Sequence, residues 1–203
     1  MNEVAHRNPE QPLDVSKQTV AVQPLVLRMQ NRIGFGAFSV VFQHPNNGKV
    51  FKLFRVRAEN IQLGDLGIHE PALRQAAFDS EVAAYQIAMG AEGIRPLVPT
   101  FHGQGVVDQV LDSDGADISH QFLLECCYVI DLVKGPAPVK FTRAVAEQHA
   151  HLRAATAAFE ASGINYWCDG AVFHASDPAL TKIIDFALDD EYGKGSEEIA
   201  LAV

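Results

Sequence analysis

The chain has 203 residues, of which 48% are hydrophobic and 20% are charged. This composition can bury a substantial core, so it excludes a chain that is disordered throughout. The formal net charge is -9, with only 16 Lys and Arg residues. Because nucleic-acid phosphates are held mainly by clustered cations, this charge balance argues against a nucleic-acid partner.

The cysteines and the N-terminus favour a cytoplasmic fold without a membrane span. Cys126, Cys127 and Cys168 are odd in number and two are adjacent, which is a poor framework for disulfides or for tetrahedral zinc. No apolar run approaches the ~20 residues that a membrane span needs. Residues 1–23 are polar and lack the apolar core of a secretory signal, so we expect a mobile leader.

Residues 24–133 begin with the pattern of an antiparallel hairpin. Two strand-like apolar runs, residues 40–42 and 50–54, flank a polar turn. The turn ends in Asn47 and Gly48, a dipeptide in which both residues accept a positive φ. The pattern therefore predicts two paired strands at this point of the chain.

The next segments predict one helix and two further strands. Residues 55–70 are charged and contain two glycines, which favours a loop. Pro71 then opens a helix to about residue 89, because apolar residues recur there at helical spacing. Residues 100–110 and 121–133 are apolar runs on either side of a polar turn, and we expect both to be strands.

The remainder of the chain predicts a smaller second part. Residues 134–138 contain two prolines and a glycine and are expected to be a linker. An alanine-rich helix is predicted over residues 141–162, and Gly163 occupies the usual position of a C-terminal cap. Short apolar pieces in residues 164–186 predict a small hairpin that turns at Asp177-Pro178.

Three polar features stand out against this apolar background. Gly34 and Gly36 precede the first strand of the hairpin, and glycines allow backbone amides to approach a phosphate without a Cβ in the way. Lys52 lies among large apolar neighbours, where burial is costly unless an anion meets it. Glu81 borders the apolar face of the predicted helix and is the preferred partner, while Glu70 before the helix is the alternative.

The order of these features resembles the motifs of the protein-kinase family. The resemblance covers about residues 33–188 and rests on five segments. The glycine-rich loop of the family resembles residues 33–42, with Ser39 in place of the third glycine. Its V-A-I-K strand resembles residues 50–53, its regulatory helix residues 78–85 and its hinge residues 128–136. Its D-F-G strand resembles residues 181–187, with Ala187 in place of glycine. This resemblance implies an α+β, protein-kinase-like fold, with an antiparallel-sheet N-lobe (24–133) that carries one helix and a much reduced C-lobe (134–203).

The resemblance also implies ATP and Mg²⁺ as cofactors and assigns residues to them. Lys52 would contact the phosphates and pair with Glu81, and Asp185 would bind the metal. Ile130 would be the gatekeeper beside the adenine, with the carbonyl of Asp131 and the amide and carbonyl of Val133 on its edge. The expected nucleotide-binding residues are Gly34, Gly36, Phe38, Val41, Lys52, Ile130, Asp131 and Val133.

The catalytic loop departs from the family pattern, because no H-R-D-x-x-x-x-N string precedes Asp185. Asp169 is the only carboxylate in this region and is the candidate base that orients the acceptor hydroxyl. Alternatively, an ungapped match puts Trp167 at the base position, and Asp169 is a turn residue. His174 would replace the asparagine that holds a second Mg²⁺, or that ligand is absent if residues 172–174 form a strand.

The resemblance implies a Ser/Thr protein kinase similar to the minimal kinases that some pathogenic bacteria deliver into host cells. We expect no activation segment, because only residues 186–203 follow Asp185. The expected partner is a protein substrate, a host protein in the effector case, after secretion into the host cell. A pseudokinase that binds nucleotide or a partner without phosphate transfer is the alternative. A small-molecule phosphotransferase is disfavoured, because those relatives carry a large C-terminal helical region.

Overall fold

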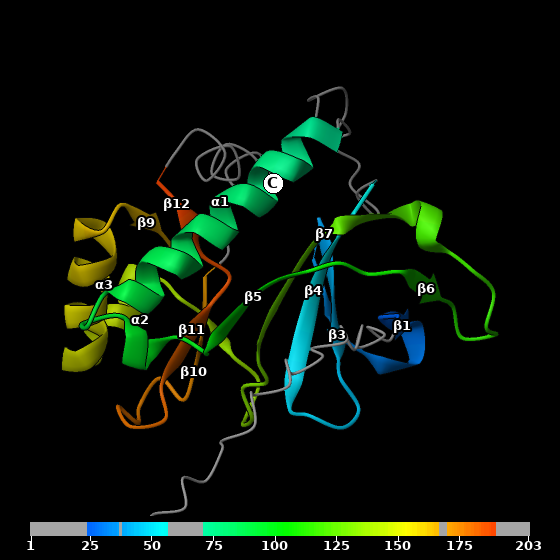
Figure 1. Cartoon of the computed structure of the whole chain (residues 1–203). Coiled ribbons are helices and arrows are strands. Elements are labelled where there is room, and N and C mark those ends of the chain that lie inside the picture. Colours follow the sequence, from blue (N-terminus) through cyan, green and yellow to red (C-terminus); the bar gives the residue numbers. More distant parts are fainter. Residues whose placement is uncertain (1–23, 37, 57–70, 167–169, 190–203) are drawn as a thin grey trace, which may run out of the picture.

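The computed structural model describes residues 24–36, 38–56, 71–166 and 170–189. A five-stranded antiparallel sheet, in the order β2-β3-β4-β7-β5, forms its larger part (Figure 1). The strands are β2 (Arg32–Phe35), β3 (Ser39–Gln43), β4 (Lys49–Arg55), β7 (Phe122–Asp131) and β5 (Phe101–Gly105). The expected hairpin is confirmed as β3 and β4.

The turn of this hairpin uses its two signal residues differently. Gly48 has a φ of 66°, a conformation that favours glycine. Asn47 does not adopt a positive φ, and its side-chain Oδ1 instead accepts a hydrogen bond from the Lys49 amide at 3.1 Å. Asn47 therefore stabilises the turn through its side chain.

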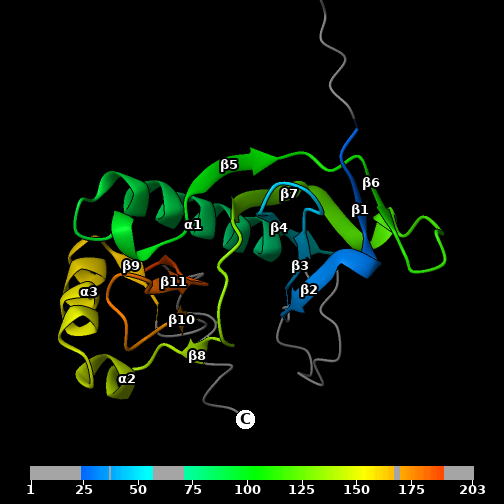
Figure 2. The ribbon, with the colours of Figure 1, turned by 90° about the horizontal axis from the view of Figure 1, so that it is seen from below.

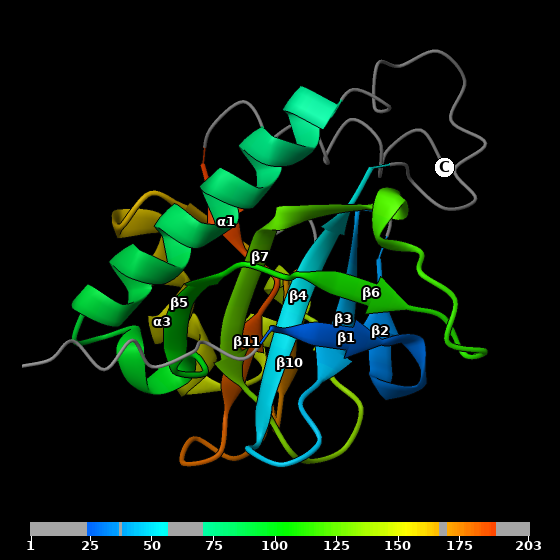
Figure 3. The ribbon, with the colours of Figure 1, turned by 45° about the vertical axis from the view of Figure 1, so that its right-hand side comes forward.

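The central strand β4 is buried on both faces of the sheet. Val50 and Phe54 belong to the core on the inner face, whereas Phe51 and Leu53 belong to a second core on the outer face. A short parallel pair crosses the outer face, as Figure 3 shows. This pair consists of β1 (Val26–Arg28) and β6 (Gln109–Leu111). Double burial explains why Val50, Phe51, Leu53 and Phe54 of β4 are apolar on both faces.

The helix α1 (Pro71–Gly90) packs on the inner face of the sheet, at the position predicted for it. Its C-terminal end extends toward the second part of the chain (Figures 1 and 2). Three short 3₁₀ helices complete the connections: η1 (Met29–Asn31), η2 (Arg95–Leu97) and η3 (Ser119–Gln121).

The described residues of the second part form two short helices and five short strands. The helices are α2 (Arg143–Glu147) and α3 (Ala150–Ala161), and the strands are β8 (Val139–Lys140), β9 (Ile164–Asn165), β10 (Ala171–Phe173), β11 (Lys182–Ile184) and β12 (Ala187–Leu188). They form the sheets β11-β10-β8 and β12-β9. The expected hairpin around Asp177-Pro178 is confirmed as β10 and β11.

The helix predicted over residues 141–162 is broken in two. Thr142 caps α2, because its Oγ1 accepts a hydrogen bond from the Val145 amide. His149 is extended, with φ -135° and ψ 126°, and α3 starts immediately after it. Gly163 has the expected positive φ of 67° beyond the end of α3.

A single apolar core connects the two parts. It joins Phe54 and Phe78 of the first part to Phe141 and Phe159 of the second. The fold is thus a mixed α+β arrangement of antiparallel sheets and few helices, in which the inner-face core joins described residues of both parts and the outer-face core belongs to the first part. Among the described residues, no helix has the length and apolar character needed to cross a membrane.

Candidate functional site

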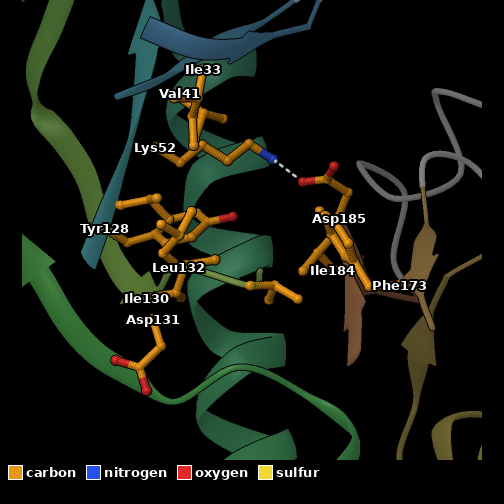
Figure 4. A pocket seen from close by; sticks show the side chains of 12 residues that line it. Ile33, Val41, Lys52, Tyr128, Ile130, Asp131, Leu132, Phe173, Ile184 and Asp185 are labelled. Atoms are coloured by element: carbon orange, nitrogen blue, oxygen red, sulfur yellow. Dashed lines mark hydrogen bonds and ion pairs between the residues drawn. The ribbon is translucent and has the colours of Figure 1, made fainter. Parts of the chain in front are cut away.

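A pocket lies between the inner face of the sheet and the β10-β11 hairpin (Figure 4). Its empty space is about 520 Å³, part of which is open to solvent. Most of the lining is apolar, and the side chains of Lys52 and Asp185 meet at one end (Figure 4). The lining residues are Ile33, Val41, Val50, Lys52, Tyr128, Ile130, Asp131, Leu132, Val133, Phe173, Ile184 and Asp185.

Lys52 is the centre of the polar end of the pocket. The β-sheet register pairs it with Val41 on one side and Tyr128 on the other, so its side chain projects from the inner face. Its Nζ donates to Glu81 Oε2 at 2.7 Å and to Asp185 Oδ1 at 3.1 Å. The predicted ion pair between Lys52 and Glu81 is confirmed, whereas Glu70 lies outside the described residues.

The charges of this cluster depend on one another. Burial alone would lower the pKa of Lys52, but the nearby carboxylates of Asp185 and Glu81 outweigh it and hold that pKa well above its usual range. Burial raises the pKa of Glu81, and the contacts from Lys52 and Tyr128 act against that rise. Lys52 is therefore a permanent cation at neutral pH, and breaking the cluster would leave a buried charge without a partner.

Tyr128 is a member of this cluster for which the sequence analysis proposed no role. Its hydroxyl donates to Glu81 Oε2 at 2.8 Å, and its side chain is fully buried. The sequence did indicate that Tyr128 faces the pocket side of the sheet, because side chains alternate along a strand. Tyr128 and Ile130 are two residues apart and must face the same side. The pattern was visible, but the contact with Glu81 depends on how α1 docks.

Asp185 occupies a bend between β11 and β12. Its φ is 57°, an uncommon conformation for a residue other than glycine. The bend sends the Asp185 carboxylate toward Lys52 (Figure 4) while Phe186 turns into the core, where its ring centroid is 4.4 Å from that of Tyr85. This reversal within two residues places a carboxylate at the pocket and an aromatic anchor behind it.

The residues expected around an adenine line the apolar end of the pocket. Val41, Ile130, Asp131 and Val133 are all among its lining residues. The side chain of Asp131 points away from the pocket (Figure 4) and contacts His102 Nε2 at 2.7 Å, so only its backbone faces the cavity. The His102 contact also lowers the pKa of Asp131.

The glycine-rich segment is only partly brought to the pocket. Ile33 lines it, but Gly34, Gly36 and Phe38 do not. The ring of Phe38 packs on the inner core and lies 5.6 Å from the guanidinium carbon of Arg74. Phe38 therefore turns toward α1, and its expected contact with a nucleotide stays a prediction.

His174 does not lie beside Asp185. Phe173 pairs with Lys182 at one end of the β10-β11 hairpin, and Ala171 pairs with Ile184 at the other. His174 follows the first pair and Asp185 follows the second, so the two side chains start from opposite ends. His174 Nε2 instead lies 2.8 Å from the Lys134 carbonyl oxygen. The prediction that His174 shares a metal site with Asp185 is therefore corrected.

The candidate base Asp169 lies outside the described residues, as does Trp167, so its position relative to Asp185 stays a prediction. Among the residues that the structure does describe, no group of three or more His, Cys, Asp or Glu side chains could hold a metal ion. Of the two metal ligands predicted from the sequence, Asp185 and His174, only Asp185 lines this pocket.

The two cysteines of strand β7 are ordinary core residues. Burial raises the pKa of Cys126 to about 11 and that of Cys127 to about 12. Both thiols therefore remain protonated at neutral pH, as expected for structural cysteines.

Comparisons of this chain with protein-family profiles, with curated proteins and with solved structures found no match. Its geometry defines a class of site, namely an apolar cleft that ends in a buried lysine held by two carboxylates.

Proposed function

We propose that the chain is an ATP- and Mg²⁺-dependent phosphotransferase of the protein-kinase type, which phosphorylates Ser or Thr in a protein. The observation that carries this proposal is the position of Lys52, 2.7 Å from Glu81 and 3.1 Å from Asp185, at the polar end of a largely apolar pocket. A phosphate group needs a fixed cation, and a flat purine needs apolar walls. The site offers both within one cavity.

The residues present fit a magnesium nucleotide. Val41, Val50 and Ile130 supply apolar surface for a base. Lys52 would hold phosphate oxygens, and Asp185 offers a carboxylate oxygen, the ligand type that Mg²⁺ prefers. When bound, the metal would neutralise phosphate charge. In this proposal Glu81 keeps Lys52 extended, and Asp169 orients the acceptor hydroxyl.

The protein-kinase-like fold is part of the same proposal. Its support is the order of the elements: a glycine-containing hairpin, a lysine strand, a helix with the paired glutamate, a strand that leads out of the sheet, and a hairpin that ends in Asp185. The resemblance to small bacterial effector kinases extends the proposal to a host protein as acceptor, reached by secretion into the host cell.

Binding without transfer is the second candidate. One observation favours it: among the described residues, no group of three or more His, Cys, Asp or Glu side chains could hold a metal ion, and His174 lies at the other end of the hairpin from Asp185. A pseudokinase of this kind would retain nucleotide affinity and lack turnover.

Calorimetry with MgATP tests the proposal directly. We expect the wild-type chain to bind, and Lys52→Met and Asp185→Asn to weaken binding by about tenfold or more, which corresponds to about 1.4 kcal/mol. Lys140→Met is the matched control, because Lys140 is an exposed lysine of β8 outside the pocket. A wild-type chain that binds no nucleotide would refute the proposal.

Phosphate transfer separates the two candidates. With γ-labelled ATP, the kinase reading predicts label on the chain itself or on general Ser- and Thr-containing acceptor proteins. Asp169→Asn should then lower transfer by several orders of magnitude and leave MgATP affinity close to that of the wild type, because a base acts only when a phosphoryl group moves. Binding without any transfer would favour the pseudokinase.

A further inference from the structure

Tyr128 and Lys52 contact the same atom of Glu81. The Tyr128 hydroxyl lies 2.8 Å from Glu81 Oε2, and Lys52 Nζ lies 2.7 Å from it. We propose that Tyr128 is a positioning residue that holds Glu81 in the Lys52-engaged position. This inference rests on the proposed function and names how that site is kept assembled.

Tyr128 is well placed to hold Glu81 because its ring has little freedom to move. It lies on the interior strand β7 directly opposite Lys52, and it is fully buried. Its ring is 6.5 Å from that of Phe78 and 5.3 Å from that of Tyr85. Because packing already fixes the ring, its hydroxyl can donate a hydrogen bond in one direction with little further loss of side-chain entropy.

The same turn of α1 is anchored from the opposite side. Ser80, the neighbour of Glu81, accepts a hydrogen bond from the Leu188 amide at 3.1 Å. One turn further along, Tyr85 packs on Phe186 at 4.4 Å between ring centroids. Strand β7 and the segment that leads into and includes β12 thus hold α1 between them.

The charges around Glu81 explain why a neutral donor is useful. Lys52 is its cationic partner, and Asp185 is the competing anion, since it takes a second hydrogen bond from the same Lys52 ammonium. A bound phosphate would add a third acceptor for Lys52. The Tyr128 hydroxyl donates to Glu81 without involving Lys52. Glu81 therefore keeps one hydrogen bond even when the Lys52 ammonium donates its hydrogen bonds to other anions.

The test compares Tyr128→Phe with Tyr85→Phe. Each variant removes one hydroxyl and retains its ring, but only the Tyr128 hydroxyl donates a hydrogen bond to Glu81. We expect Tyr128→Phe to weaken MgATP binding by about tenfold, the effect of losing a hydrogen bond to a charged group, and to leave adenosine binding within about twofold. Tyr85→Phe should leave both affinities within about twofold.

Adenosine discriminates positioning from general packing, because it lacks the phosphates that Lys52 would hold. In a Glu81→Gln background, the effect of Tyr128→Phe on MgATP affinity should shrink, because residues that act through one contact are not additive. Equal losses for adenosine and ATP, or an unchanged ATP affinity in Tyr128→Phe, would overturn the proposal.

The failure of the proposed function can be recognised separately. If the wild type binds neither ligand, the site is not a nucleotide site, and the contact is then judged from urea unfolding of the same variants. If the Tyr128→Phe, Glu81→Gln double variant loses less in its urea midpoint than the two single variants lose together, the positioning role is supported. Strictly additive losses would refute it.

Discussion

Two residues of the pocket are in arrangements that are unfavourable without their neighbours: the backbone of Asp185 and the buried charge of Lys52. Asp185 has a positive φ, and a buried lysine lies between two carboxylates. Such conformations persist only where the surrounding contacts over-determine them. For Asp185 these contacts are the Lys52 ammonium on one side and the packing of Phe186 on the other.

Gly135 provides a residue-scale prediction in the segment that leaves the sheet. Its φ is 145°, and a Cβ at this position would lie 2.1 Å from His174 Nε2. Gly135→Ala should therefore lower the free energy of unfolding by about 1–3 kcal/mol, since both the backbone and the His174 ring must move. Urea denaturation measures the loss.

Gly90→Ala is the matched control for this substitution. Gly90 ends α1, and an added Cβ would meet nothing within 4 Å. Alanine is the better helix former, so Gly90→Ala should be neutral or stabilising by up to about 1 kcal/mol. An equal loss in the two variants would show that the close approach to His174 is not the cause.

At the scale of elements, α1 is the piece that brings the chemistry together. Sequence places Lys52 on β4, Glu81 on α1 and Asp185 after β11, and only the docking of α1 between sheet and β12 makes them neighbours. The contact of Ser80 with the Leu188 amide is a polar tie in this docking.

Ser80→Ala tests this tie. Removing the hydroxyl oxygen leaves the Leu188 amide without this acceptor, and an unsatisfied buried donor costs about 1–3 kcal/mol. We expect a loss of that size in the free energy of unfolding and faster hydrogen exchange at the Leu188 amide. Thr142→Ala is a suitable comparison, because it removes a helix cap of α2 and should leave exchange at Leu188 unchanged. Unchanged exchange in Ser80→Ala would contradict the tie.

At the scale of the whole molecule, the two parts of the chain share one core. Phe159 of α3 contacts Phe186 at 5.3 Å and Tyr166 at 5.7 Å between ring centroids, and Phe186 in turn meets Tyr85 of α1. This chain of aromatic contacts runs from the second part into the helix that covers the sheet. The two parts should therefore unfold together.

Cooperativity of unfolding checks this expectation. Circular dichroism and the fluorescence of the single tryptophan should give coincident urea transitions in the wild type. Phe159→Ala should shift both transitions equally and lower the free energy of unfolding by about 3–5 kcal/mol, since it empties a fully buried site. Two separate transitions would instead indicate lobes that fold independently.

Much of the fold could be predicted because its signals are local. The β3-β4 hairpin, the start of α1 at Pro71, the cap glycine Gly163 and the β10-β11 hairpin all appear where turn chemistry and periodicity place them. The break at His149 was not predicted. Its effect is tertiary, because the break allows both α2 and α3 to bury apolar residues in the shared core.

The candidate site was predictable in its residue types and less so in its geometry. Lys52, Glu81 and Asp185 were named from the order of motifs, and the structure brings them together. His174 was misplaced because counting along the chain does not reveal which end of a hairpin a residue occupies. That depends on register, which is set by pairing across strands.

By itself, the sequence determined the α+β class, the main hairpin and helix, and which polar residues stand out from an apolar background. These follow from periodicity and turn chemistry, which act over a few residues. The tertiary structure alone decided that Tyr128 meets Glu81, that Phe38 turns toward α1, and that the two parts share one core. Each of these depends on packing between distant segments, where many side chains must fit at once and no local pattern specifies the partner.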